Sequence, residues 1–140
     1  MYGEQLCQLL QALKVASPKN PDALAGAYAA ITSSYKGYKD HALKSFLGKV
    51  SCGAVYPATG ADDNQGQVFF KTLAAICCDP TGDCLEPIIR FHQNNDLAVC
   101  ASWAYFTFVL GLLNGQSAQE ATGAALEKVE VGVYFSNLFK

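Results

Sequence analysis

The sequence predicts an all-α protein, a single domain over residues 1–140 built as a bundle of six to seven helices. Three observations support this prediction. Apolar residues recur at helical spacing, cap residues and prolines mark helix starts, and the longest uncharged run, Leu97 to Leu113, is apolar on all sides. We therefore expect the other helices to surround one central apolar helix at about residues 96–114.

Two amphipathic helices are predicted at the N-terminal end. The first ends before Ser17-Pro18 and carries a stripe of Leu6, Leu9, Leu10 and Leu13. The second begins at Asn20-Pro21, because asparagine is a favoured N-cap residue and proline is favoured at the first helical position. Gly37 can end it, and its buried face is expected to contain Leu24, Tyr28, Ile31 and Tyr35.

A third helix is predicted from an Asp40 cap to about Tyr56, where Pro57 prevents its continuation. The following segment, residues 57–65, is rich in Gly, Asp and Asn, so we expect an exposed and mobile loop. Its polar residues Asp62, Asp63 and Asn64 are a candidate contact surface.

The remaining segments also read as helices. A fourth helix is expected from about residue 66 to 78, ended by Asp79-Pro80, and a short one begins at Pro87. After the central helix, Ser117 to Glu120 matches a capping box. Beyond Val129 the apolar residues alternate with period two, yet we expect helix there because no partner strand is evident.

Six cysteines in 140 residues suggest a disulfide framework, because an even count at this density is typical of secreted domains. Cys77 and Cys78 are adjacent on a helix and point about 100° apart, so each should reach a different neighbour. We expect one of them to bond to Cys100. The six half-cystines would be Cys7, Cys52, Cys77, Cys78, Cys84 and Cys100. The alternative is buried free thiols in a cytoplasmic protein.

Composition and charge exclude several classes. The net charge is −2 and the basic residues are dispersed, so no nucleic-acid partner is expected. The sequence lacks C-x-x-C and offers two histidines, so it predicts no metal site and no cofactor. The run from Leu97 to Leu113 is at the short limit for a bilayer, so we expect a buried helix and no stable membrane span. The start of the chain carries no signal-peptide pattern, which fits either its absence or its removal.

Candidate catalytic residues follow from composition alone. A cysteine nucleophile needs a nearby base, and Cys52 with His41 or Cys100 with His92 supplies both residue types. Neither pair lies in a recognisable motif, so the sequence favours a protein without catalytic activity.

Aromatic residues suggest a pocket for an apolar ligand. The chain contains eight phenylalanines, seven tyrosines and one tryptophan. The residues that we expect to line such a pocket are Trp103, Tyr28, Tyr35 and Phe106.

A further pattern extends from Ser51 to Val129. It consists of Ser51-Cys52-Gly53-Ala54, then Phe91-His92 before Ala98-Val99, then Asn114-Gly115 and Ser117 to Ala121. The pattern resembles a portion of the ADP-ribosylglycohydrolases. The acidic metal-binding motifs of that family are not matched, so the resemblance implies a similar packing of helices and not the activity.

The sequence therefore predicts a small, secreted, disulfide-stabilised helical binding protein of effector, toxin or carrier type. Its partner would be a protein or a small apolar ligand, and its oligomeric state is left open. One alternative is an intracellular inhibitor, immunity or assembly factor whose cysteines are buried thiols. Another is a hydrolase with a Cys-His or carboxylate site.

Overall fold

Seven helices and no strand are present in the part of the chain that the computed structural model describes, residues 2–138, with side chains placed through Glu130. The prediction of an all-α domain is confirmed. The helices are α1 (Tyr2–Val15), α2 (Pro21–Ser33), α3 (His41–Ser51), α4 (Gln67–Cys78), α5 (Leu85–Arg90), α6 (Asp96–Leu113) and α7 (Ala118–Leu138).

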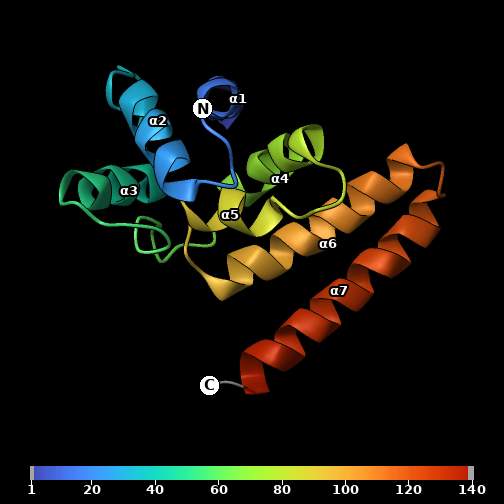
Figure 1. Cartoon of the computed structure of the whole chain (residues 1–140). Coiled ribbons are helices and arrows are strands. Elements are labelled where there is room, and N and C mark those ends of the chain that lie inside the picture. The colour runs from blue at the N-terminus through green and yellow to red at the C-terminus, as the bar shows by residue number, and fades with distance from the viewer. Residues whose placement is uncertain (1, 139–140) are drawn as a thin grey trace.

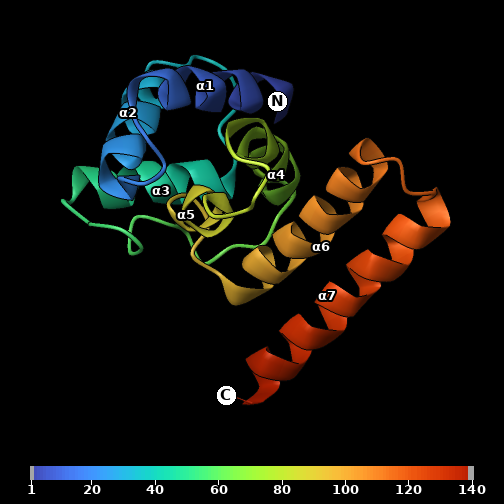
Figure 2. The same cartoon turned by 45° about the vertical axis from the view of Figure 1, so that its right-hand side comes forward.

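The helices form two groups. Helices α1 to α5 pack around one another, and α6 and α7 form an antiparallel hairpin beside them (Figure 1). Helix α6 lies against α4 and α5, and α7 packs mainly on the other side of α6 (Figure 2). The hairpin therefore has its inner helix against the body and its outer helix on the surface.

Predicted cap residues occupy the helix starts. The Asn20 side chain accepts a hydrogen bond from the Ala23 amide (3.2 Å), and Asp40 accepts one from the Leu43 amide (2.9 Å). Ser117 Oγ accepts from the Glu120 amide and donates to its carboxylate, both at 3.1 Å. These bonds satisfy amides that the first helical turn leaves unpaired.

Two helix boundaries differ from the sequence prediction. Helix α3 ends at Ser51 and not near Tyr56, because Gly53 adopts a left-handed conformation (φ +84°) that stops the helix before Pro57. Helix α5 begins at Leu85, two residues before Pro87. The segment beyond Val129 is helical as far as Leu138, as expected.

The buried core lies in the body and not around α6, which corrects the prediction of a bundle centred on the apolar helix. Tyr28 of α2 and Phe46 of α3 are fully buried and pack against Phe91, with ring centroids 5.4 to 5.7 Å apart. Most of the rest of this core is aliphatic and comes from α1, α2, α3, α4 and α5: Leu9, Leu24, Leu43, Val68, Leu85, Ile88 and Ile89. Helix α6 adds Ala98 and Phe106 at its edge.

Helix α6 is apolar but only partly covered, and most of its residues are half-buried. Only 22% of its residues are buried, because α7 covers one side and α4 with α5 covers another. Within the described residues it is the one helix long and apolar enough to cross a membrane, a property that core helices of soluble proteins share. A helix that is apolar all round and incompletely covered has surface available for a partner.

The cysteines are not paired. All six lie within the described residues and all are free thiols, so the predicted disulfide staples are absent from this structure. Four of them are exposed: Cys7, Cys52, Cys77 and Cys78. Cys100 Sγ faces the Val129 carbonyl oxygen at 3.9 Å, so the predicted bond from Cys77 or Cys78 to Cys100 does not form. The number and spacing of the cysteines in the sequence did not indicate which of them would lie close enough to bond.

Candidate functional site

The first catalytic pair of the sequence analysis is not brought together. His41 begins α3 and Cys52 follows its last residue, so the length of the helix, about 16 Å, separates them. His41 is exposed and its Nδ1 lies 3.0 Å from the Asp63 carboxylate. This contact joins the start of α3 to the loop before α4 and leaves Cys52 without a base.

The second pair is also separated. Cys100 faces α7 through its contact with Val129, and burial raises the pKa of its thiol, which disfavours a nucleophilic thiolate. His92 is fully buried in the body, between Tyr28 and Phe46, with ring centroids 5.5 Å away in both cases. Among the described residues, no group of three or more His, Cys, Asp or Glu side chains is placed to hold a metal ion.

The loop at residues 57–65 is tied to the body more firmly than predicted. Thr59, Gly60 and Ala61 are buried, since Thr59 Oγ1 donates to the Phe91 carbonyl (2.8 Å) and the Ala61 amide donates to the His92 carbonyl (2.9 Å). A Cβ atom on Gly60 would lie 2.2 Å from the Arg90 carbonyl oxygen, so only glycine fits there.

The candidate contact residues therefore differ in role. Asp62 accepts a hydrogen bond from Asn95 (2.8 Å), and Asp63 accepts from Gln93 (3.3 Å) and the Gln65 amide (2.7 Å). Burial disfavours the Asp63 carboxylate, but hydrogen bonds from the Gln65 amide, His41 and Gln93 hold its pKa below the ordinary value. Both acidic side chains hold the loop in place, while Asn64 is exposed.

A pocket of about 290 Å³ opens between α6 and α7. Two of the four predicted pocket residues, Trp103 and Phe106, line it, with their rings edge to face at 5.5 Å. The other two lie elsewhere: Tyr28 is in the core, and Tyr35 hydrogen bonds to Glu4 at the surface. The remaining lining residues are Thr107, Leu110, Gly111, Asn114, Gln116, Ala124 and Lys128.

Small residues let the two helices of the hairpin approach closely. A Cβ atom on Gly111 would lie 3.3 Å from Cβ of Ala121 and 2.4 Å from the Gln116 side chain. Ala121 is fully buried in this contact. Trp103 rests against Gly82, where a Cβ atom would lie 2.9 Å from the indole ring. The pocket therefore has a fixed apolar floor, with polar groups and the Lys128 ammonium among the residues that line it.

A second pocket, of about 570 Å³, lies between the end of α1 and the turn after α4. Cys78, Asp79 and Cys84 line it opposite Lys14 and Lys19. Burial raises the pKa of both thiols, so neither is activated as a nucleophile.

A third feature is a group of buried polar side chains beneath the loop at residues 57–65. Lys71 and His92 are fully buried, and Lys71 Nζ donates to the Ile89 carbonyl (3.1 Å). Burial lowers the pKa of Lys71 well below its ordinary value, against the attraction of Asp63 and Asp40. Burial and the nearby Lys71 likewise lower the pKa of His92. Both groups are enclosed, so a substrate has no open path to them.

Sequence reasoning missed Lys71 and its amide neighbours Gln67 and Gln93. Lys71 lies within an apolar run and four residues after Gln67, and Ala74 and Ala75 follow on the same face. That position in the helical period is a signal that it points inward. Asp40 accepts from Gln67 and from Gln5 (3.1 Å), so its carboxylate links α1, α3 and α4.

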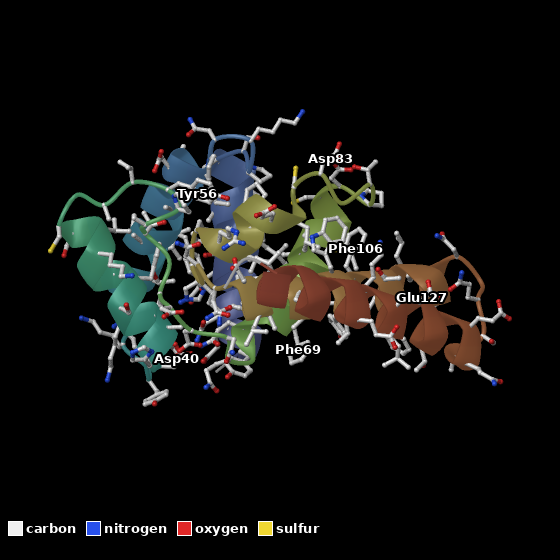
Figure 3. The ribbon with its side chains drawn as sticks, turned by 90° about the horizontal axis from the view of Figure 1, so that it is seen from below. Asp40, Tyr56, Phe69, Asp83, Phe106 and Glu127 are labelled. Atoms are coloured by element: carbon white, nitrogen blue, oxygen red, sulfur yellow. The ribbon has the colours of Figure 1, made fainter. Side chains whose placement is uncertain are left out.

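The hairpin pocket and the second pocket are neighbours, because Trp103 of the first contacts Gly82, two residues before Cys84 of the second. In Figure 3, Phe106 and Phe69 lie on opposite sides of the hairpin, and Asp40 lies at the far side of the body from Glu127 of α7. No protein-family model, curated protein or solved structure matches this chain, so the resemblance to ADP-ribosylglycohydrolases gains no support from these comparisons.

Proposed function

We propose that this chain is a binding protein without catalytic activity, and that the α6–α7 hairpin is its docking surface for an amphipathic helix of a partner protein. The observation that carries this proposal is the incomplete cover of α6, with the Trp103 pocket between it and α7. The separation of both cysteine and histidine pairs supports a function in binding.

Large apolar side chains are exposed on and beside the hairpin. Leu113 is 68% exposed and Leu126 57%, whereas the exposed Phe69 of α4 lies on the side of the hairpin opposite Phe106 and is not part of this surface. Leu97, Leu112 and Val129 are exposed as well. Soluble monomers rarely leave many apolar side chains uncovered in one region unless that region meets a partner.

The pocket specifies the chemistry of the partner. Trp103, Phe106 and Leu110 would receive one bulky apolar side chain, as in recognition of a helix by an apolar groove. Among the described side chains, no carboxylate pairs with Lys128, so an acidic residue of the partner would complement it. An amphipathic helix with an apolar anchor and a flanking acid meets both requirements.

The free cysteines bear on where this binding takes place. Six unpaired thiols, four of them exposed, support a reducing compartment, because exposed thiols are oxidised in secreted proteins. We therefore favour the intracellular form of the proposal, an inhibitor, immunity or assembly factor, over a secreted effector.

The pocket can be tested with an apolar anionic dye, 8-anilinonaphthalene-1-sulfonate. Trp103 is the single tryptophan, so energy transfer from it to the dye reports binding near the pocket. Ala124→Phe fills the pocket and should abolish the transfer, while Ala30→Phe on the exposed face of α2 should preserve it. Equal transfer in both variants would place the dye elsewhere.

The partner can be tested by selecting displayed helical peptides on the immobilised protein. Selected peptides should bind wild type and Ala30→Phe alike, and should lose about tenfold or more in affinity for Ala124→Phe. Enrichment of no peptide, or of peptides insensitive to Ala124→Phe, contradicts the proposal. Sedimentation of wild type against Leu126→Lys tests self-association, and a dimer lost in that variant would assign the surface to a second copy of the chain.

A further inference from the structure

Several polar atoms inside the body have no partner within the described protein. They are on residues that are at most 1% exposed, in α1, in α2 and after α5. The atoms are His92 Nδ1 and Nε2, Tyr28 OH, Gln5 Oε1 and Gln93 Oε1. Gln8 Oε1 is also without a partner, but no contact joins it to this group.

Contacts place these residues around one region. The Tyr28 ring lies 5.5 Å from the His92 ring. Burial raises the pKa of Tyr28 and lowers that of Lys71, and the charge of Asp40 acts on both groups to raise the pKa. Gln5 donates to Asp40 and Gln93 donates to Gln67 (3.3 Å), which in turn donates to Asp40. Polar side chains of α1, α2 and α4, the Asp40 cap of α3, and the two residues His92 and Gln93 after α5 are thus neighbours in the buried interior.

The unpartnered groups are a mixture of donors and acceptors. Lys71 uses one N–H on the Ile89 carbonyl and has at least one other, and the Tyr28 hydroxyl also donates. Gln5 Oε1 and Gln93 Oε1 accept, and neutral His92 provides one donor and one acceptor. A buried polar group without a partner is costly, so such groups normally meet an ordered molecule.

Charge narrows the choice of that molecule. Asp40 and Asp63 already influence Lys71, so the region has no net positive charge to attract an anion. A cation would need carboxylate oxygens as ligands. Both oxygens of Asp40 already accept hydrogen bonds from Gln5, Gln67 and the Leu43 amide, which disfavours a cation. A small uncharged molecule that both donates and accepts hydrogen bonds satisfies these buried, unpartnered groups best.

We propose that Lys71, His92, Tyr28, Gln5 and Gln93 form an internal binding site for such a molecule, and that it is occupied by a cluster of ordered water. The water molecules bridge His92 and the Tyr28 hydroxyl to the Lys71 amino group and the glutamine oxygens. The buried loop residues Thr59 to Ala61 close the site through their bonds to the backbone of Phe91 and His92. This site is separate from the α6–α7 hairpin.

Nuclear magnetic resonance of ¹⁵N-histidine-labelled protein tests this directly. His92 and His41 are the only histidines, and the exposed His41 serves as the surface control. We expect a cross-relaxation peak between the His92 ring protons and bound water, of the sign that marks long residence, and none of that sign for His41. Mass spectrometry of material released on denaturation distinguishes an organic occupant. The proposal is overturned if His92 shows no cross-relaxation peak to bound water and no molecule is released on denaturation.

A variant provides an independent test. His92→Phe keeps an aromatic ring against Tyr28 and Phe46 but removes both nitrogen atoms. If those nitrogens bind an internal molecule, its loss should raise the unfolding equilibrium constant by about tenfold at pH 8, where His92 is neutral. Unchanged or greater stability shows that the nitrogens had no partner, and rejects the site. His41→Gln is the matched control and should change the constant less than about threefold.

Discussion

The imidazole ring of His92 packs against the ring of Tyr28 with their centroids 5.5 Å apart, and neither side chain is exposed to solvent. A histidine in this position is held in its neutral form, because a charge there would be removed from water and lie near Lys71. The body of the protein is therefore built around a titratable group, which has consequences for its stability.

Stability should increase with pH from mildly acidic to alkaline conditions. The pKa of His92 is lowered from 6.5 in the folded state, so the unfolded state binds the proton more readily, and stability is lost as pH falls below 6.5. The pKa of Lys71 is lowered from 10.5 in the folded state, so its contribution to the stability of the fold also increases as pH rises toward 10.5. Urea unfolding measured from pH 5 to pH 9 tests both.

The control for this pH dependence is His92→Phe, which should flatten the profile between about pH 5 and 7 and leave the alkaline rise. A wild-type stability that is constant or that falls with rising pH across this range would contradict the assignment of His92 as a buried neutral ring.

The Asp40 carboxylate should contribute more to the free energy of unfolding than a helix cap alone does. Asp40→Ala removes the acceptor of the Leu43 amide and leaves the Gln5 and Gln67 amides unpaired, so we expect a loss of about 3 kcal/mol. Asp40→Asn keeps one oxygen that can accept from the Leu43 amide but loses the second oxygen that accepts from the two glutamines. Its loss of stability should be smaller than that of Asp40→Ala. Chemical denaturation measures both.

Asn20→Ala is the matched control for Asp40. It removes a cap bond to Ala23 at an exposed site, and should cost about 1 kcal/mol. Equal losses for Asp40→Ala and Asn20→Ala would show that the link from Asp40 to α1 and α4 contributes nothing to stability.

Gly60 should not tolerate a side chain. In Gly60→Ala the new Cβ atom would lie 2.2 Å from the Arg90 carbonyl oxygen and 2.5 Å from the Asn94 amide nitrogen, both backbone atoms. We expect the loop to detach from residues 90–94 and the free energy of unfolding to fall by about 2 kcal/mol or more. Thermal unfolding measures this loss.

Gly26→Ala in α2 is the control, because a Cβ atom there meets nothing within 4 Å and alanine favours helix. It should raise stability by up to about 1 kcal/mol. A Gly60→Ala protein as stable as wild type would mean that the loop is not fixed at this contact.

All six cysteines should titrate as thiols in denaturant without reductant, because none is paired. In the folded protein the exposed Cys7 and Cys52 should react fastest with Ellman's reagent, and the buried Cys84 slowest, since burial raises its thiol pKa. Intact mass after alkylation counts the thiols. Fewer than six alkylated cysteines would restore the disulfide hypothesis.

Local sequence rules predicted the elements well. Asn20, Asp40 and Ser117 each cap the helix that they were expected to cap, because a cap depends on residues three positions apart in the chain. The end of α3 was placed too late, since the left-handed conformation of Gly53 stops the helix before the proline that was taken as its limit.

The candidate site was predicted only in part. Trp103 and Phe106 lie together at the pocket between α6 and α7, because they are three residues apart on one helix, and the binding of an apolar ligand there stays a prediction. Tyr28 and Tyr35 were grouped with them by residue type, but they are on α2 and face different surroundings. Lys71 was missed because charged residues are rarely buried.

The sequence by itself determined the all-α class and the helix starts, since these depend on periodicity and on contacts within a few residues. The tertiary structure alone decided that the six thiols are unpaired, that α6 lies beside the core, and that Lys71 and His92 lie close together beneath the loop at residues 57–65. Each of these depends on how helices distant in the chain pack together. Helical spacing shows which residues share one face of a helix, but not which helix that face contacts.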